Sequence, residues 1–582
     1  MNIGDNRQLY NINGELKSNF LDISSDGKLL LKIDDKKINL YDLMIKHKLT
    51  GAYVRVLPLI RKTMDHVIKV FNNVFRKYGY NGKLYPVYPL KVNTRDIVVD
   101  TIYKHGSRYN WGFNLNTYPE IKVIEKYLND EPRMIVFDGL LSRGILEGLK
   151  KFYKKDWFVV VDISSLRDAE LMDKYNEFSI GLRIKYLTRG KGPWKESSGL
   201  DSKFGLTITV LNNIIDRYDW IYERAILLHM HPGSQIHDLG LFKKYFIEAS
   251  NMFNELRNKG FNRLEYIDLG GGLAYPYYEA KFGSIESPNY RLEEYVENMV
   301  KVFSEKLAKH PNIVFENGRY IVASHRIVVS KVIEVRPYRS NTIELTKECR
   351  FEELDKITDI EELTSYIEEY ERKMNIEREH AMNDLDSRKK FEEKIACFDK
   401  YINIKIYELI GKDREALINA LNNRVLKNYL ITPSHRFYIA SSIFTHIPDK
   451  LVVNQYFQVV PLQRLNEKPE VLGVLSDLTC DSMGEYGDFI SYIGREGEIM
   501  FSRHDKKLIG IPGKKIRLKG IPLHLPDKDE EYFIALLDTG AYQDMLAMKH
   551  NSLEGYDEVL IDIIDGELKI TVKHLEEKPY DY

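Results

Sequence analysis

Residues 85–94 read YPVYPLKVNT and combine a strand-forming run with one charged side chain. The tyrosines, Val87 and Leu90 are aromatic and apolar types that are enriched in buried strands. Lys91 follows them directly, although an unpaired buried charge is strongly destabilising. The stretch therefore predicts a buried strand that ends on an amine.

Similar short β-type runs alternate with amphipathic segments from about residue 52 to residue 335. Segments such as TRDIVVDTIYKHG carry apolar residues at helical spacing. Such alternation predicts a (β/α)₈ barrel, with a doubly wound open sheet as the alternative. The candidate strands are residues 84–91, 109–114, 133–139, 157–163, 179–186, 225–233, 265–272 and 312–319.

Charged, histidine and glycine residues gather at the carboxyl ends of these runs. In (β/α)₈ barrels the carboxyl ends of the strands form the face that carries the active site. The shared bias favours the barrel over the open sheet and predicts a site on that face. The residues concerned are Lys91, Asp162, His231, Gly270, Gly271, Gly272, Glu316 and Arg319.

The rest of the chain has a different character. Residues 344–426 are rich in Glu, Lys and Leu and contain no proline, which predicts an insertion of long surface helices. Residues 427–582 return to β-type segments and predict an antiparallel β domain. Residues 1–51 contain hairpin-like sequence that we expect to join this β domain. The predicted fold class is α/β, a TIM-like barrel plus a C-terminal β domain.

Composition excludes several other classes of protein. The 582 residues include 85 Lys and Arg against 86 Asp and Glu, so no electrostatic argument favours a nucleic-acid partner. We expect no secretory signal, since the first residues carry acids and no apolar segment, and no apolar run has transmembrane length, which argues against a membrane partner. The three cysteines are too sparse for a disulfide framework or a metal clamp. We expect a soluble cytoplasmic enzyme.

Each candidate site residue also has an ordinary structural explanation. Lys91 could extend to solvent, the glycines could form a tight turn, His231 could be a semi-buried core residue, and Glu316 and Arg319 could be an ion pair. Together they match the needs of pyridoxal 5′-phosphate (PLP): an amine for a Schiff base, a phosphate cradle, a carboxylate for the ring nitrogen, and a flat ring to stack on. The combination predicts a PLP enzyme.

The chain resembles the fold-type III PLP-dependent decarboxylases, and most closely the biosynthetic arginine decarboxylases. Motifs along almost the whole chain carry the resemblance: YNINGELKSNFLDISSDG, YPVYPLKVN, GKGPWKESSG, LLHMHPGSQ, YIDLGGGLAY, FENGRYIVASH, VLSDLTCDSMG and GAYQDMLAMKHN. The GKGPWKESSG and SDLTCDS strings are specific to the arginine enzymes, whereas the ornithine and diaminopimelate enzymes share only the shorter motifs.

The resemblance implies a role for each matching residue. Lys91 matches the lysine that binds the cofactor, His231 the stacking histidine and Glu316 the partner of the ring nitrogen. Lys203 matches a barrel lysine with a structural or electrostatic role. Residues that match the remaining cofactor contacts, chiefly to the phosphate, are Ser234, Gly271, Gly272, Arg319 and Tyr542.

The resemblance also implies a reaction and an assembly. The reaction is decarboxylation of L-arginine to agmatine and CO₂, the first step of a polyamine route. Cys480 and Asp481 match a pair that reaches the neighbouring subunit's active site, where Cys480 reprotonates Cα and Asp481 binds the distal cation. A homodimer with shared sites follows, with a tetramer built through the insertion as a further expectation. Magnesium is associated with the family, but the sequence shows no dedicated carboxylate cage.

Three departures from the family pattern keep alternatives open. TCDSMG has Met483 where an acid is common, HNSLEG (residues 550–555) lacks the usual aromatic residue, and ENGR replaces ESGR or EPGR. One alternative is a decarboxylase of ornithine or lysine. The other is a catalytically silent regulatory homologue, although such proteins typically lose the Schiff-base lysine or the phosphate site.

Overall fold

A computed structural model describes residues 3–190, 199–279, 286–338, 351–411, 413–494 and 498–576. Within them, eight parallel strands close into a barrel, which confirms the predicted fold class and excludes the open sheet. The barrel closes where β12 pairs with β5. Its strands are β5 (Leu84–Pro89), β6 (Gly112–Leu115), β7 (Met134–Phe137), β8 (Phe158–Ile163), β9 (Ser179–Arg183), β10 (Ala225–His229), β11 (Tyr266–Asp268) and β12 (Asn312–Phe315).

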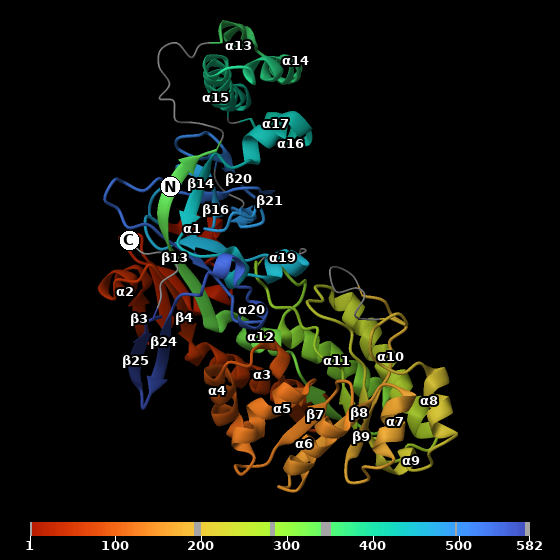
Figure 1. Ribbon diagram of the computed structural model, residues 1–582. Helices are drawn as coiled ribbons and strands as arrows, with labels where there is room; N and C mark the ends of the chain where they lie inside the picture. Colours follow the sequence, from red (N-terminus) through yellow and green to blue (C-terminus); the bar gives the residue numbers. More distant parts are fainter. Residues whose placement is uncertain are drawn as a thin grey trace.

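Amphipathic helices surround the barrel (Figure 1). The strands are near-continuous apolar runs because helices cover their outer face and side chains fill the interior. Ser and Thr side chains cap several helices, as Ser142, Ser165 and Thr207 do. The main helices are α3 (Leu57–Tyr78), α4 (Asp96–Gly106), α5 (Tyr118–Ile124), α6 (Arg143–Tyr153), α7 (Leu166–Met172), α8 (Ile208–Ile215), α10 (Leu239–Asn258) and α11 (Leu292–Lys306).

The second domain is built on a large, mostly antiparallel sheet. Its central strands are β4 (Gly51–Val56) and β13 (Arg326–Pro337), which pair with each other. They flank the barrel in the chain, so the predicted barrel range of 52–335 includes residues that pair in this sheet. Their neighbours are β14 (His435–Ile439), β15 (Val459–Pro461), β16 (Val471–Ser476), β17 (Glu485–Tyr486), β22 (Ile521–Leu523), β23 (Phe533–Leu536), β24 (Asp557–Ile564) and β25 (Glu567–Lys573).

The N-terminal segment packs on this second domain. It forms a small antiparallel sheet of β1 (Leu21–Ile23), β2 (Leu29–Ile33) and β3 (Lys36–Asn39). The Asn6 side chain donates to the carbonyl of Leu465 at 2.7 Å. The start of the chain and its C-terminal third are therefore joined through specific contacts.

A helical hairpin projects from the second domain at the end opposite the barrel (Figure 1). Its two long helices, α14 (Ile360–Ala381) and α15 (Leu385–Ile410), pack against each other beside the shorter α13 (Glu352–Lys356), α16 (Arg414–Asn422) and α17 (Arg424–Ile431). Cys397 on α15 is disulfide-bonded, whereas Cys480 is a free thiol. The sequence argued against a disulfide framework, and it did not single out Cys397 as a bonded cysteine.

Among the described residues, none of the helices combines the length and the apolar character needed to cross a bilayer. Most of the GKGPWKESSG motif and the third cysteine, Cys349, lie outside the described residues.

Candidate functional site

A pocket of about 300 Å³ lies at the carboxyl ends of the barrel strands. Lys91 reaches it from the turn after β5, and Glu316 and Arg319 reach it from the segment after β12. Its wall on the side of the second domain includes Asp449 and Tyr542. The pocket brings together the predicted residues Lys91, His231, Ser234, Gly271, Gly272, Glu316, Arg319 and Tyr542.

Lys91 is held at the pocket by its neighbours in the chain. The Tyr542 N–H donates to the carbonyl of Val92 at 2.8 Å, and the Asn93 side chain donates to the carbonyl of Gly540 at 2.9 Å. Burial alone would lower the pKa of Lys91, but the carboxylates of Asp138 and Glu316 outweigh burial and raise it. The free amine is therefore a cation stabilised by acids.

His231 presents a neutral ring to the pocket. Burial, together with the positive charges of Lys91 and Arg183, holds the pKa of His231 well below its usual value. The Gly233 N–H donates to Nδ1 at 3.1 Å, so this nitrogen carries no proton. Gly270 lies against the ring with φ +65°, and a Cβ there would approach His231 Cδ2 to 2.6 Å. Only glycine allows this close packing.

Glu316 is a buried acidic residue that lines the pocket. Its Oε1 accepts a hydrogen bond from Asn114 at 3.2 Å and lies 3.7 Å from Nε2 of His229. Burial raises the pKa of Glu316, while the charges of Lys91 and His229 oppose that rise.

The remaining predicted residues form a set of donors suited to a phosphate. Arg319 is 6% exposed, donates to the hydroxyl of Tyr277 at 3.0 Å and lies with its guanidinium 4.5 Å from the centre of the Tyr542 ring. Ser234, Gly271 and Gly272 line the same pocket. Gly272 has φ +107°, a conformation that turns the loop at the pocket. A guanidinium, hydroxyls and loop N–H groups fit a phosphate, and Lys91 and Glu316 fit the aldehyde and ring nitrogen of PLP.

Cys480 and Asp481 do not join the pocket of their own chain. They lie on a turn between β16 and β17, where Cys480 is exposed and its Sγ is 3.9 Å from Nδ2 of Asn551. Asp481 accepts the Met483 N–H at 2.8 Å and lies 3.9 Å from His550. Lys203 is likewise exposed, 5.2 Å from the Phe204 ring.

The sequence analysis did not predict several residues that lie at the site. Asp138 directly follows β7, so the strand-end rule applied there would have found it. Asp449 begins α19 (Asp449–Val453) in the second domain, and its carboxylate accepts from Gln543 at 3.0 Å and lies 3.6 Å from Arg319. No pattern in the barrel sequence points to a residue from another domain.

Comparison with known proteins agrees with this site. Residues 64–323 match the family described as pyridoxal-dependent decarboxylase, pyridoxal binding domain. The biosynthetic arginine decarboxylases of Bacteroides thetaiotaomicron and Citrifermentans bemidjiense are each 28% identical, over 97% and 94% of this chain and 90% and 86% of their own lengths.

Solved structures give the same result. The biosynthetic arginine decarboxylase SpeA from Campylobacter jejuni matches with a TM-score of 0.71 and 26% identity, over 97% of this chain and 90% of that one. Diaminopimelate decarboxylase from M. jannaschii, at 14% identity and a TM-score of 0.61, shares the fold. The barrel thus matches the pyridoxal-binding domain of the pyridoxal-dependent decarboxylases. The chain is homologous, nearly end to end, to the biosynthetic arginine decarboxylases.

Proposed function

We propose that this protein is a PLP-dependent decarboxylase that converts L-arginine to agmatine and CO₂, the first step of a polyamine route. The observation that carries the proposal is the meeting of Lys91, His231, Glu316 and Arg319 in one pocket. Homology over 97% of the chain to a biosynthetic arginine decarboxylase supports the choice of substrate.

Each residue of the pocket has a separate role in holding the cofactor. PLP supplies the electron sink for loss of the carboxylate. The Lys91 amine attaches the cofactor, and the neutral His231 ring packs against its face. The Glu316 carboxylate would accept a hydrogen bond from the protonated ring nitrogen, which keeps the ring electron-poor. The phosphate of the cofactor is held and oriented by Arg319, Ser234, Tyr542 and the N–H groups of the Gly271–Gly272 loop.

The substrate assay is the direct test. The purified holoenzyme is incubated separately with L-arginine, L-ornithine and L-lysine, and CO₂ release and the amine product are measured. We expect agmatine from arginine and little product from the shorter amino acids. Absence of agmatine would overturn the proposed substrate, and putrescine or cadaverine would identify the enzyme as an ornithine or lysine decarboxylase.

We also propose that the active unit is a homodimer in which Cys480 and Asp481 serve the partner's pocket. Their exposed turn supports this arrangement, because neither residue lines the pocket of its own chain. Exposed apolar side chains near the turn and the pocket rim also favour a covering partner. They are Val452 (62%), Met483 (52%), Leu546 (39%) and Met548 (39%). In the partner's pocket, the Cys480 thiol donates the proton to Cα and the Asp481 carboxylate binds the planar guanidinium.

Mixing two variants of strongly reduced activity tests the shared site. Lys91→Ala chains and Cys480→Ala chains are combined so that mixed dimers form, and activity is compared with each variant alone. A mixed dimer contains one pocket with both residues intact, so activity returns. Lys91→Ala mixed with Glu316→Gln is the matched control, since every mixed pocket then stays defective. Failure of the first mixture to recover, with mixed dimers detected, contradicts the shared site.

The helical hairpin supports a further proposal, a tetramer built from two dimers. Ile376, Met382 and Leu385 at its tip are 63%, 73% and 85% exposed. Apolar side chains gathered at the end of a projecting hairpin favour contact with another chain. Light scattering of Met382→Glu and Leu385→Glu variants tests this: a shift to dimers with full activity is expected, and an unchanged mass contradicts it.

A further inference from the structure

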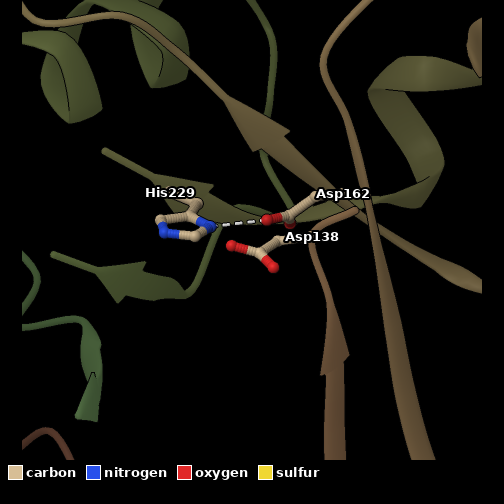
Figure 2. Close-up of side chains that lie close together, drawn as sticks. All are labelled: Asp138, Asp162 and His229. Carbon is tan, nitrogen blue, oxygen red and sulfur yellow. Dashed lines mark hydrogen bonds and ion pairs between the residues drawn. The ribbon is translucent and has the colours of Figure 1, made fainter. Parts of the chain in front are cut away.

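A cluster of buried charged side chains surrounds Glu316 and has no role in the proposed function so far. Figure 2 shows three of its members, with His229 bonded to Asp162 and Asp138 beside them. The acids and His229 are at most 1% exposed. They come from neighbouring barrel strands or the residues that follow them: Asp138, Asp162, His229, Asp268 and Glu316.

His229 occupies the centre of this cluster and faces acids on both sides. Its Nδ1 lies 2.5 Å from Oδ2 of Asp162, and its Nε2 lies 3.7 Å from Oε1 of Glu316. The Asp268 carboxylate is close enough that one ligand atom of each of His229, Asp268 and Glu316 falls within 4.8 Å of the others. An imidazole that faces carboxylates with both nitrogens is a donor at both only when it is protonated.

The acids of the cluster favour that proton on His229. Burial alone would lower the pKa of His229, but Asp268 and Asp162 raise it to about 9. Three cations act on Glu316: Lys91, His229 and Arg183. Arg183 already pairs with Asp138 at 3.1 Å, and Lys91 gives up its free ammonium when it binds the cofactor. His229 is then the cation that faces Glu316 among the described residues.

We propose that His229 is a positioning residue whose positive charge keeps Glu316 ionised. The Glu316 carboxylate can then accept a hydrogen bond from the ring N–H of the cofactor. The inference rests on the proposed function and adds a residue to its machinery. Without the imidazolium, Glu316 would share a buried site with Asp268, and two adjacent acids in a low dielectric retain a proton between them. A protonated Glu316 cannot accept the ring N–H.

Paired substitutions separate the charge of His229 from its polar contacts with Asp162 and Glu316. His229→Asn keeps a donor near the position of Nδ1 toward Asp162, and His229→Gln keeps one near the position of Nε2 toward Glu316. Neither carries a charge. His524→Asn is the control for loss of a buried histidine, because His524 is 0% exposed but contacts Tyr532 in the second domain.

The readout is the absorbance of the bound cofactor without substrate, recorded from about pH 6 to about pH 9. Because loss of the charge raises the pKa of Glu316, both His229 variants should resemble Glu316→Gln at the acidic end and approach the wild-type spectrum as pH rises. The decarboxylation rate at pH 7 should fall about tenfold or more, as it does when outer partners of reactive groups are removed. His524→Asn should keep the wild-type spectrum.

The double variant His229→Asn/Glu316→Gln decides between positioning and plain packing. If His229 acts through Glu316, the double variant has the spectrum and rate of Glu316→Gln alone. Fully additive losses, or a wild-type spectrum at all pH values in either His229 variant, would overturn the inference. A wild-type protein with no cofactor absorbance would instead overturn the proposed function, so the two failures remain distinct.

Discussion

The pocket and the turn that carries Cys480 contain residues predicted for one reaction, yet they differ in burial and in support. Glu316 and Arg319 are 1% and 6% exposed, whereas Met483 in the turn is 52% exposed. Contacts with both domains fix the pocket, whereas the hydrogen bonds of the turn include those that Asp481 accepts from Met483 and Gly484. One chain assembles the groups for the cofactor, and our dimer proposal assigns the groups for the substrate to a second chain.

Removal of Lys91 should have the largest effect on the pocket side of this comparison. Lys91→Ala is expected to abolish covalent cofactor binding and to lower activity at least about 10³-fold, since it deletes the attacking amine. Absorbance of the protein after reduction with borohydride measures the attachment. Lys309→Ala, at a surface lysine paired with Glu265, is the control and should retain both. Retained attachment in Lys91→Ala would refute the assignment of the lysine.

The next largest effect is expected for Asp544, a residue that supports the pocket. Asp544, two residues beyond Tyr542, bonds Arg55 bidentately at 2.8 Å and lies 3.5 Å from Arg326. Asp544→Asn removes an acid from two buried arginines, of which Arg55 still pairs with Glu558 at 2.6 Å, and it is expected to cost about 3–5 kcal/mol of unfolding free energy. Asp481→Asn on the exposed turn is the control and should cost less than about 1 kcal/mol. Denaturant titration compares the two variants.

The pH dependence of this stabilisation has a definite sign. Despite burial, the charges of Arg326 and Arg55 hold the pKa of Asp544 well below its usual value. A lowered folded-state pKa contributes stability above the unfolded-state pKa of about 4, which is lost as pH falls further. The stability gap between wild type and Asp544→Asn should therefore narrow only in strong acid. A gap already closed at about pH 5 would contradict this origin.

Removal of Cys480 should affect the chemistry without affecting the cofactor. Cys480→Ala is expected to lower kcat about 10²-fold, in the range for loss of a general acid, with cofactor absorbance and affinity unchanged. Reduced proton delivery to Cα should also divert product toward transamination, detectable as a carbonyl by-product. Cys480→Ser is the comparison that retains a weaker proton donor. Wild-type kinetics in Cys480→Ala would show that Cys480 has no role in catalysis.

The smallest effect is expected at Met483. Met483→Asp places the acid common in the family beside Asp481 and should lower KM for arginine by up to about fivefold, since an exposed charge pair contributes at most about 1 kcal/mol. Ile564→Asp, at an exposed apolar residue at the end of β24, should leave KM for arginine nearly unchanged. If Met483→Asp instead favours ornithine or lysine over arginine, the turn does not recognise the distal group of the substrate as we propose.

Part of this organisation was accessible from the sequence because parallel strands in a barrel end on one face. Lys91, His231, Glu316 and Arg319 each follow a strand, so their convergence needed only the correct fold. Met230 separates His229 from His231, yet His229 received no role, because its partners Asp162 and Glu316 lie on other strands. Asp449 was missed for a related reason, since it enters the pocket from the second domain.

The sequence by itself determined the barrel and the second domain and predicted the cofactor-side residues, because strand periodicity and strand-end chemistry are local properties of the chain. Tertiary structure alone decided which charges share a buried space. The pairing of His229 with Asp162 and Glu316, and the separation of Cys480 from its own pocket, depend on distances between distant segments. Burial and charge then set the protonation of those groups, which no local pattern encodes.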